Sequence, residues 1–160
     1  MTFDDRLQRA IERGQRRGQA AHDAAKANAL SEEELRRRHG DYRLRISEHI
    51  EQCVKKVPNY FPGFETEIIY GERGWGAACY RNDMRIEGGK RNQDYSRLEM
   101  TVRPFSPYHV LELTSKATIR NKEIFNRTHY EQIADVELPK FLELIDLWVL
   151  EFAEMYAAKS

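Results

Sequence analysis

The sequence predicts an α+β protein in which two N-terminal helices precede an antiparallel sheet of about four to six strands, and a long apolar helix follows the sheet. Three observations lead to this order. Apolar residues recur every three or four positions over residues 3–57, at every second position in segments of 66–114, and again with helical spacing after residue 136. A chain of 160 residues with 41% apolar content can also bury one hydrophobic core.

The first 30 residues are predicted to form a helical arm with little apolar surface of its own. Phe3, Leu7 and Ile11 lie four residues apart and therefore share one side of this helix. Small side chains bury little area, and a glycine costs about 1 kcal/mol relative to alanine in a helix. We therefore expect residues 1–30 to be an arm that is mobile unless something covers it, and residues 31–160 to form a single α+β domain. Beyond Ile11 the same side of the arm continues as Gly14, Gly18, Ala21 and Ala25.

A second helix is predicted from about Glu32 to Val57. Ser31 is followed by three glutamates, and a serine with a glutamate three positions later forms the capping box of a helix start. Pro58 marks the end of this helix, and Gly40 allows a bend within it. The predicted buried stripe consists of Leu35, Tyr42, Ile46, His49 or Ile50, Cys53 and Val57.

Period-two alternation then predicts four strands. They cover residues 65–70, residues 75–81 with a possible extension to 86, residues 97–103 and residues 109–114. The glycine-rich and polar segment 88–94 is expected to be a flexible loop. Alternating apolar and polar residues indicate one buried and one solvated face, which is typical of antiparallel sheets.

The remaining 46 residues contain one ambiguous segment and one clear helix. Residues 115–134 fit either a hairpin around residues 120–123 or a short helix, and we favour the hairpin. Asp135 is the predicted N-cap of the last helix, from about Val136 to Ala157. Apolar side chains surround most of that helix, so we expect it to be buried on more than one side, by the sheet and by the second helix or another copy of the chain.

No motif predicts a catalytic, cofactor-binding or metal-binding residue, and no GxSxG or SxxK motif occurs. Cys53 and Cys79 lack the CxxC spacing of zinc sites, so we expect them to be reduced thiols in a cytoplasmic protein. We expect His22, His39 and His49 to lie on helices without a ligand-spaced His or Cys. No run of about 18 apolar residues occurs, so membrane insertion is not expected.

The leading functional hypothesis is a non-enzymatic protein-binding module, of the adaptor or chaperone-like kind, that forms a homodimer. The apolar last helix and the under-packed arm are the two surfaces that favour it. An enzyme without a recognisable motif is kept as an alternative. The residues expected to contact a partner are Phe141, Trp148, Phe152 and Met155.

A nucleic-acid-binding protein is the other alternative. The net charge of the chain is zero, so binding to phosphates depends on a local basic surface. Acidic residues nearby favour a solvated helix face over such a surface. The candidate basic residues, which share roughly one face of the arm, are Arg9, Arg13, Arg16 and Arg17.

Overall fold

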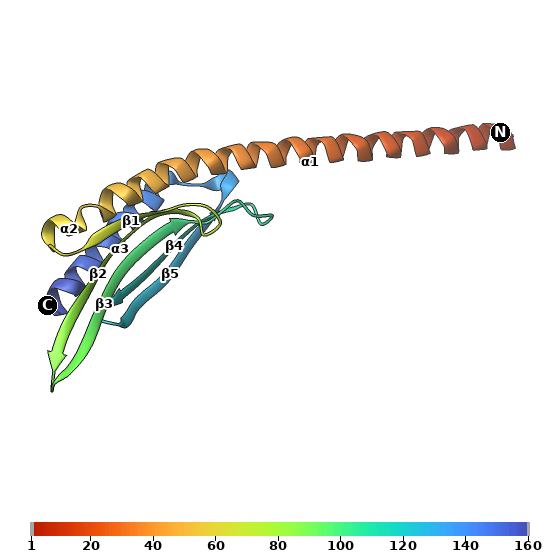
Figure 1. The fold of residues 1–160 in the computed structure, drawn as a ribbon. Coiled ribbons are helices and arrows are strands. Elements are labelled where there is room, and N and C mark those ends of the chain that lie inside the picture. Colours follow the sequence, from red (N-terminus) through yellow and green to blue (C-terminus); the bar gives the residue numbers. More distant parts are fainter. Residues whose placement is uncertain (1, 160) are drawn as a thin grey trace. The chain divides into compact units, whose positions relative to one another are not determined.

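The fold is of the α+β class, as the sequence predicts: along the chain, two helices precede a five-stranded antiparallel sheet and one helix follows it. The structure is a computed structural model that describes residues 2–159, apart from the side chains of residues 27–30. Its contacts divide the chain into two compact units, residues 1–37 and residues 38–160. The sheet and the last helix both belong to the second unit (Figure 1).

Two helices precede the sheet, but their boundaries differ from the prediction. Helix α1 spans Phe3–Val54, and α2 is a single turn at Val57–Tyr60. The expected helix start at Ser31 is therefore wrong. The residues ahead of it are rich in alanine, the strongest helix former, and no proline or glycine between residues 19 and 39 ends the helix. A capping box can start a helix only where the residues before it are not helical, and here α1 is already helical and continues through Ser31.

The sheet is a meander in which each strand pairs with the next one along the chain. All four pairings are antiparallel, and the order in the sheet is the order in the sequence (Figure 1). The strands are β1 at Glu65–Ile69, β2 at Trp75–Glu87, β3 at Lys90–Val102, β4 at Val110–Ile119 and β5 at Lys122–Gln132.

The predicted loop at residues 88–94 is wrong, because β2 and β3 form a long hairpin that turns on only two residues. Gly88 and Gly89 both have positive φ, at 60° and 78°, and Glu87 pairs with Lys90 directly beyond them. Two residues with positive φ give the turn whose twist matches that of paired strands. The polar residues that follow are therefore strand residues.

The predicted hairpin in residues 115–134 is confirmed. Arg120 and Asn121 form its turn with positive φ values of 47° and 71°. Asn121 also holds the turn against β3, since its side-chain amide donates to the carbonyl oxygen of Gln93 at 2.7 Å and its oxygen accepts from the N–H of Tyr95 at 2.9 Å. This contact to a third strand fixes the hairpin in the sheet.

The last helix, α3, spans Leu138–Lys159. The sequence predicted Asp135 as its N-cap, and this prediction is wrong. Asp135 lies in a short 3-10 turn at Ile133–Asp135, ahead of the start of α3. One side of α3 is buried, while Leu147 and Leu150 on the other side are 50% and 63% exposed. The sheet covers one side of α3 and the end of α1 lies beside another, whereas the side that carries Leu147 and Leu150 is not covered within this chain. The buried residues of α3 are Phe141, Ile145, Trp148, Val149, Phe152 and Tyr156.

The core of the second unit lies between one face of the sheet and a layer formed by α3 and the end of α1, which run side by side (Figure 1). The His129 ring of β5 contacts Phe141 of α3 at 5.0 Å between ring centroids, and Arg127 forms an ion pair with Glu151. These contacts identify the buried sheet face. Helix α1 contributes three fully buried side chains to this core, those of Ile46, Ile50 and Val54.

None of the helices in residues 2–159 combines the length and the apolar character that a membrane crossing requires.

Candidate functional site

The N-terminal half of α1 presents an uncovered apolar stripe. Every side chain from residue 2 to residue 26 is exposed. Phe3, Leu7 and Ile11, which the sequence places on one side of the helix, are 74%, 47% and 53% exposed. Met1 and the side chains of residues 27–30, which the predicted arm also includes, lie outside the described residues.

The two glycines that continue this stripe leave open space beside the helix. No atom outside their own turn of α1 lies within 4 Å of a Cβ built on Gly14 or Gly18. Another backbone can therefore approach the helix closely at these positions. The stripe thus combines large side chains in its first part with a shallow surface in its second.

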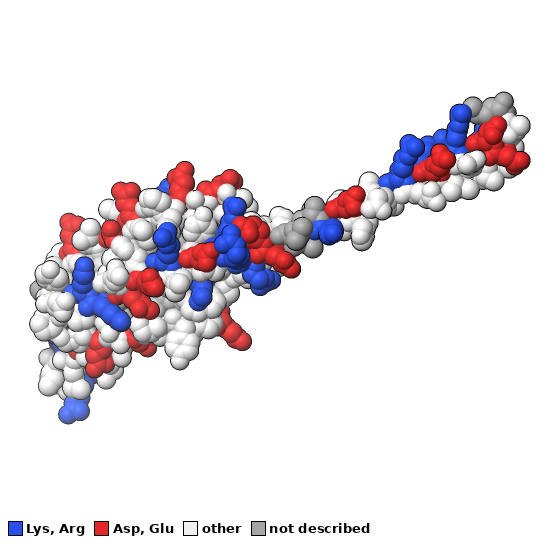
Figure 2. All heavy atoms as spheres, turned by 90° about the horizontal axis from the view of Figure 1, so that it is seen from above, with Lys and Arg blue, Asp and Glu red and all other residues white. Residues whose placement is uncertain are grey.

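The four arginines of the nucleic-acid alternative are exposed on the same helix. Arg9, Arg13 and Arg16 border one shallow hollow, together with Glu12. Basic and acidic side chains lie next to one another at this end of α1 (Figure 2). A carboxylate within the basic surface weakens its attraction for phosphates, so the arginines form a mixed charged surface instead of a continuous basic one.

The structure places most of the predicted partner-contacting residues of α3 inside the domain. Phe141 and Phe152 have no exposure, Trp148 is buried and Met155 is half-buried. These side chains cover the sheet of their own chain. An external partner of α3 would therefore contact the exposed side of the helix, which carries Leu147 and Leu150.

An apolar groove of about 540 Å³ lies on this exposed side, between the end of α1, α2 and α3. Tyr60 and Leu150 border it and are 79% and 63% exposed. A groove of this size and character is large enough for apolar side chains of a partner. Its lining residues are Cys53, Lys56, Val57, Tyr60, Phe61, Asp146, Val149, Leu150 and Ala153.

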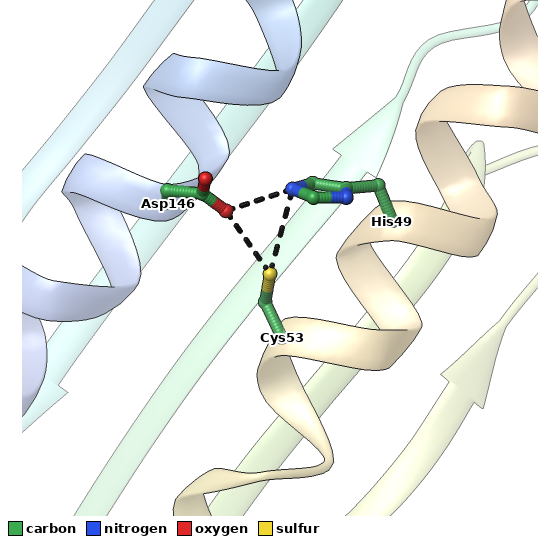
Figure 3. Close-up of side chains that lie close together, drawn as sticks. All are labelled: His49, Cys53 and Asp146. Carbon is green, nitrogen blue, oxygen red and sulfur yellow. Dashed lines mark hydrogen bonds and ion pairs between the residues drawn. The ribbon is translucent and has the colours of Figure 1, made fainter.

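A polar cluster of His49, Cys53 and Asp146 lies at the edge of the groove (Figure 3). His49 Nε2 lies 2.7 Å from Asp146 Oδ1, and the Cys53 thiol donates to the same oxygen at 3.3 Å. The third side of the triangle, from Cys53 Sγ to His49 Nε2, measures 3.6 Å. Two residues come from successive turns of α1 and the third from α3, so the cluster joins the two helices.

The cluster does not have the arrangement of an activated cysteine nucleophile. In a catalytic triad, the acid binds one ring nitrogen of the histidine and the nucleophile binds the other. Here, Cys53 and Asp146 both approach Nε2 of His49. Burial, followed by the hydrogen bond to the Asp146 carboxylate and its charge, raises the pKa of the Cys53 thiol to about 11. The thiol is therefore protonated at neutral pH and is a poor nucleophile.

The expectation that His49 has no ligand-spaced partner is wrong, because Cys53 lies one helical turn away and its sulfur is within 4.8 Å of the ring. The signal was present in the sequence, since residues at i and i+4 of a helix share one face. Asp146 could not be found in the same way. It lies 93 residues beyond Cys53 and joins the cluster only through the packing of α3.

Comparisons of the chain with protein-family models, with curated proteins and with solved structures give no match.

Proposed function

We propose that this protein is a non-enzymatic protein-binding module of the adaptor type, which associates with a second copy of itself through its N-terminal arm. One observation carries the proposal. All side chains of residues 2–26 are exposed, including the apolar stripe of Phe3, Leu7 and Ile11. With two free thiols, Cys53 and Cys79, we place the protein in a reducing compartment such as the cytoplasm.

A helix whose apolar side chains are all exposed receives little stabilisation from tertiary packing. Isolated helices are marginal in water even with favourable sequences, and most helical stability in proteins comes from a buried apolar face. Gly14 and Gly18 lower the intrinsic stability of the arm further, by about 1 kcal/mol each. A partner that covers the stripe would supply the missing stabilisation.

The stripe favours a second copy as this partner because its two halves are complementary in size. If two arms lie antiparallel and cross near Gly14, the large half of each stripe meets the small half of the other. Alternating large and small side chains across an interface allow close packing without voids. The facing pairs would be Phe3 with Ala25, Leu7 with Ala21, and Ile11 with Gly18.

Light scattering after gel filtration tests the proposal with the full chain. We expect a dimer at tens of micromolar and a dissociation constant that Leu7→Asp raises about 100-fold or more. Each of the two substituted positions loses about 1–2 kcal/mol of apolar burial and adds the desolvation of a charge. The matched control is Arg13→Gln, because Arg13 is exposed and lies outside the stripe.

A chain that stays monomeric at 100 μM, or a dimer that Leu7→Asp leaves intact, would contradict association through the arm. The near-ultraviolet circular dichroism of Trp75 and Trp148, which both lie in the second unit, must match for all variants, so that unfolding of the domain is not mistaken for dissociation. Leu7→Ala provides a second variant that keeps a strong helix former at this position, and it should give a smaller effect of the same sign.

The nucleic-acid alternative is favoured by the hollow that Arg9, Arg13 and Arg16 border. It requires binding to labelled RNA or DNA whose log affinity falls linearly with log salt concentration, and weaker binding for Arg13→Gln. Salt-sensitive binding of this kind by a chain that remains monomeric would favour this alternative over self-association.

A further inference from the structure

The polar cluster at the edge of the apolar groove brings together three side chains that bind transition metals. Its ligand atoms are an imidazole nitrogen, a thiol sulfur and a carboxylate oxygen, and all lie within 4.8 Å of one another. From this geometry we propose that His49, Cys53 and Asp146 bind one divalent cation of the zinc class. The proposal is independent of association through the arm.

The distances between the ligand atoms are close to those of a tetrahedral site. With usual zinc–ligand bond lengths, a sulfur and a nitrogen ligand lie about 3.6 Å apart, sulfur and oxygen about 3.6 Å, and nitrogen and oxygen about 3.4 Å. The corresponding distances here are 3.6, 3.3 and 2.7 Å. Only Asp146 needs to withdraw from His49, by about 0.7 Å, which a rotation of an exposed aspartate side chain can provide.

The backbone holds two of the ligands in place before an ion arrives. His49 and Cys53 are separated by four residues on α1, so their side chains lie on the same face one above the other. The side chain of Asp146 is 51% exposed and that of His49 is 27% exposed. An ion can therefore reach the cluster from solvent without opening the core.

The type of ligand selects the type of metal. Sulfur and imidazole ligands suit zinc and its neighbours, whereas magnesium and calcium prefer sites made of oxygen atoms. A thiolate and a carboxylate would balance the two positive charges of the ion, and the thiol proton of Cys53 would pass to solvent. Three protein ligands leave the fourth tetrahedral position for a water molecule or a donor from a bound partner, as in zinc sites with an open position.

Cobalt(II) is the probe for the test, because it occupies zinc sites and is coloured. Reduced, chelator-treated full-length protein is titrated with cobalt chloride under anaerobic conditions. We expect one equivalent to give the visible bands of tetrahedral cobalt together with a near-ultraviolet sulfur-to-cobalt charge-transfer band, and one equivalent of zinc to abolish both. Cys53→Ser should remove the charge-transfer band and weaken zinc binding by more than about 100-fold.

Cys79→Ser is the matched control, since Cys79 is a buried thiol of the sheet outside the cluster. It should keep the cobalt spectrum unchanged, and Asp146→Asn should keep the charge-transfer band with weaker binding. The absence of both cobalt bands at millimolar cobalt in folded wild-type protein, or their persistence in Cys53→Ser, would overturn the proposal. Leu7→Asp should bind cobalt like the wild type, so failure of arm association and failure of metal binding can be told apart.

Discussion

Replacing Gly18 by leucine should strengthen the free arm and weaken its association at the same time. Gly18 is exposed, and no atom outside its own turn of α1 lies within 4 Å of the Cβ that a substitution adds. In the separate chain, leucine therefore meets no steric conflict. Because leucine is a far better helix former than glycine, the substitution should stabilise the arm helix by about 0.8 kcal/mol.

In the proposed dimer the same leucine would lie in the seam, beside Ile11 of the second copy. Overpacking of a fitted interface costs typically about 1–3 kcal/mol for each site, and symmetry places two such sites in the dimer. The loss of about 2–6 kcal/mol corresponds to a dissociation constant at least about 30-fold higher. Helix content of the separate chain and dimer stability should thus change in opposite directions.

Far-ultraviolet circular dichroism measures the first change at low concentration, and sedimentation equilibrium measures the second over a concentration series. Arg13→Leu is the control for added apolar surface, because Arg13 lies outside the stripe and the substitution should leave the dissociation constant nearly unchanged. If Gly18→Leu associates as tightly as the wild type, or more tightly, then Gly18 does not face a partner backbone and the antiparallel packing is refuted.

Three further predictions concern the folded domain. In metal-free protein, Asp146→Asn should speed the alkylation of Cys53 by iodoacetamide, because it replaces the carboxylate acceptor of the thiol by a weaker amide and removes a negative charge, which lowers the pKa of the thiol. The rate should rise about three- to fourfold for each unit by which that pKa falls, since the thiolate also becomes less nucleophilic. An unchanged rate would mean that burial alone raises this pKa. Asn121→Ala should lower the free energy of unfolding, measured in urea, by about 2 kcal/mol, because alanine tolerates the φ of 71° poorly and lacks both side-chain hydrogen bonds. Asn121→Gly should lower it less, since glycine accepts positive φ. Equal losses for the two variants would show that the hydrogen bonds alone matter. Glu151→Gln should lower the free energy of unfolding by only about 0.5 kcal/mol at pH 7, because the side chains of Glu151 and Arg127 are both more than a third exposed and solvent screens their attraction. The hydrogen bond from Arg127 lowers the pKa of Glu151 below its ordinary value of 4.5. The stabilisation by this ion pair is therefore present above pH 4.5 and should vanish as the pH falls through the lowered pKa. A difference in unfolding free energy between wild type and Glu151→Gln that persists in acid would exclude the ion pair as its source.

Local periodicity was sufficient to predict the class and order of the fold. The alternation around Leu98 and Met100 marks a strand with one buried face, and both side chains are fully buried. The turn at Arg120 and Asn121 was also predictable, because Asn accepts positive φ more readily than most residues. These features depend on neighbouring residues alone.

The errors arise where one local signal competes with another. The capping box at Ser31 is a valid helix start, yet an alanine-rich helix was already present ahead of it and continued through it. The residues after Gly89 are polar, as in a loop, but cross-strand pairing with β2 makes them a strand. Polarity distinguishes solvated from buried positions more reliably than it distinguishes a loop from an exposed hairpin.

The candidate metal site required tertiary information. His49 and Cys53 can be placed on one face of α1 from the sequence, but the third ligand comes from α3. Which turn of α3 meets α1 depends on how Phe141 and Phe152 pack on the sheet, and no local pattern specifies that register. The burial of the same side chains also explains why apolarity alone did not identify a partner surface on this helix.

The most direct measurement of the arm's role is the distance between spin labels on two copies, at Thr2 in one sample and at Gln15 in another, with Cys53 and Cys79 replaced. In antiparallel arms that cross near Gly14, labels at Gln15 lie close together. Labels at Thr2 lie about 36 Å apart along the helix axis, at 1.5 Å of rise for each residue of offset. Short distances at both positions would indicate parallel arms, and no intermolecular coupling at either position would contradict association through the arm.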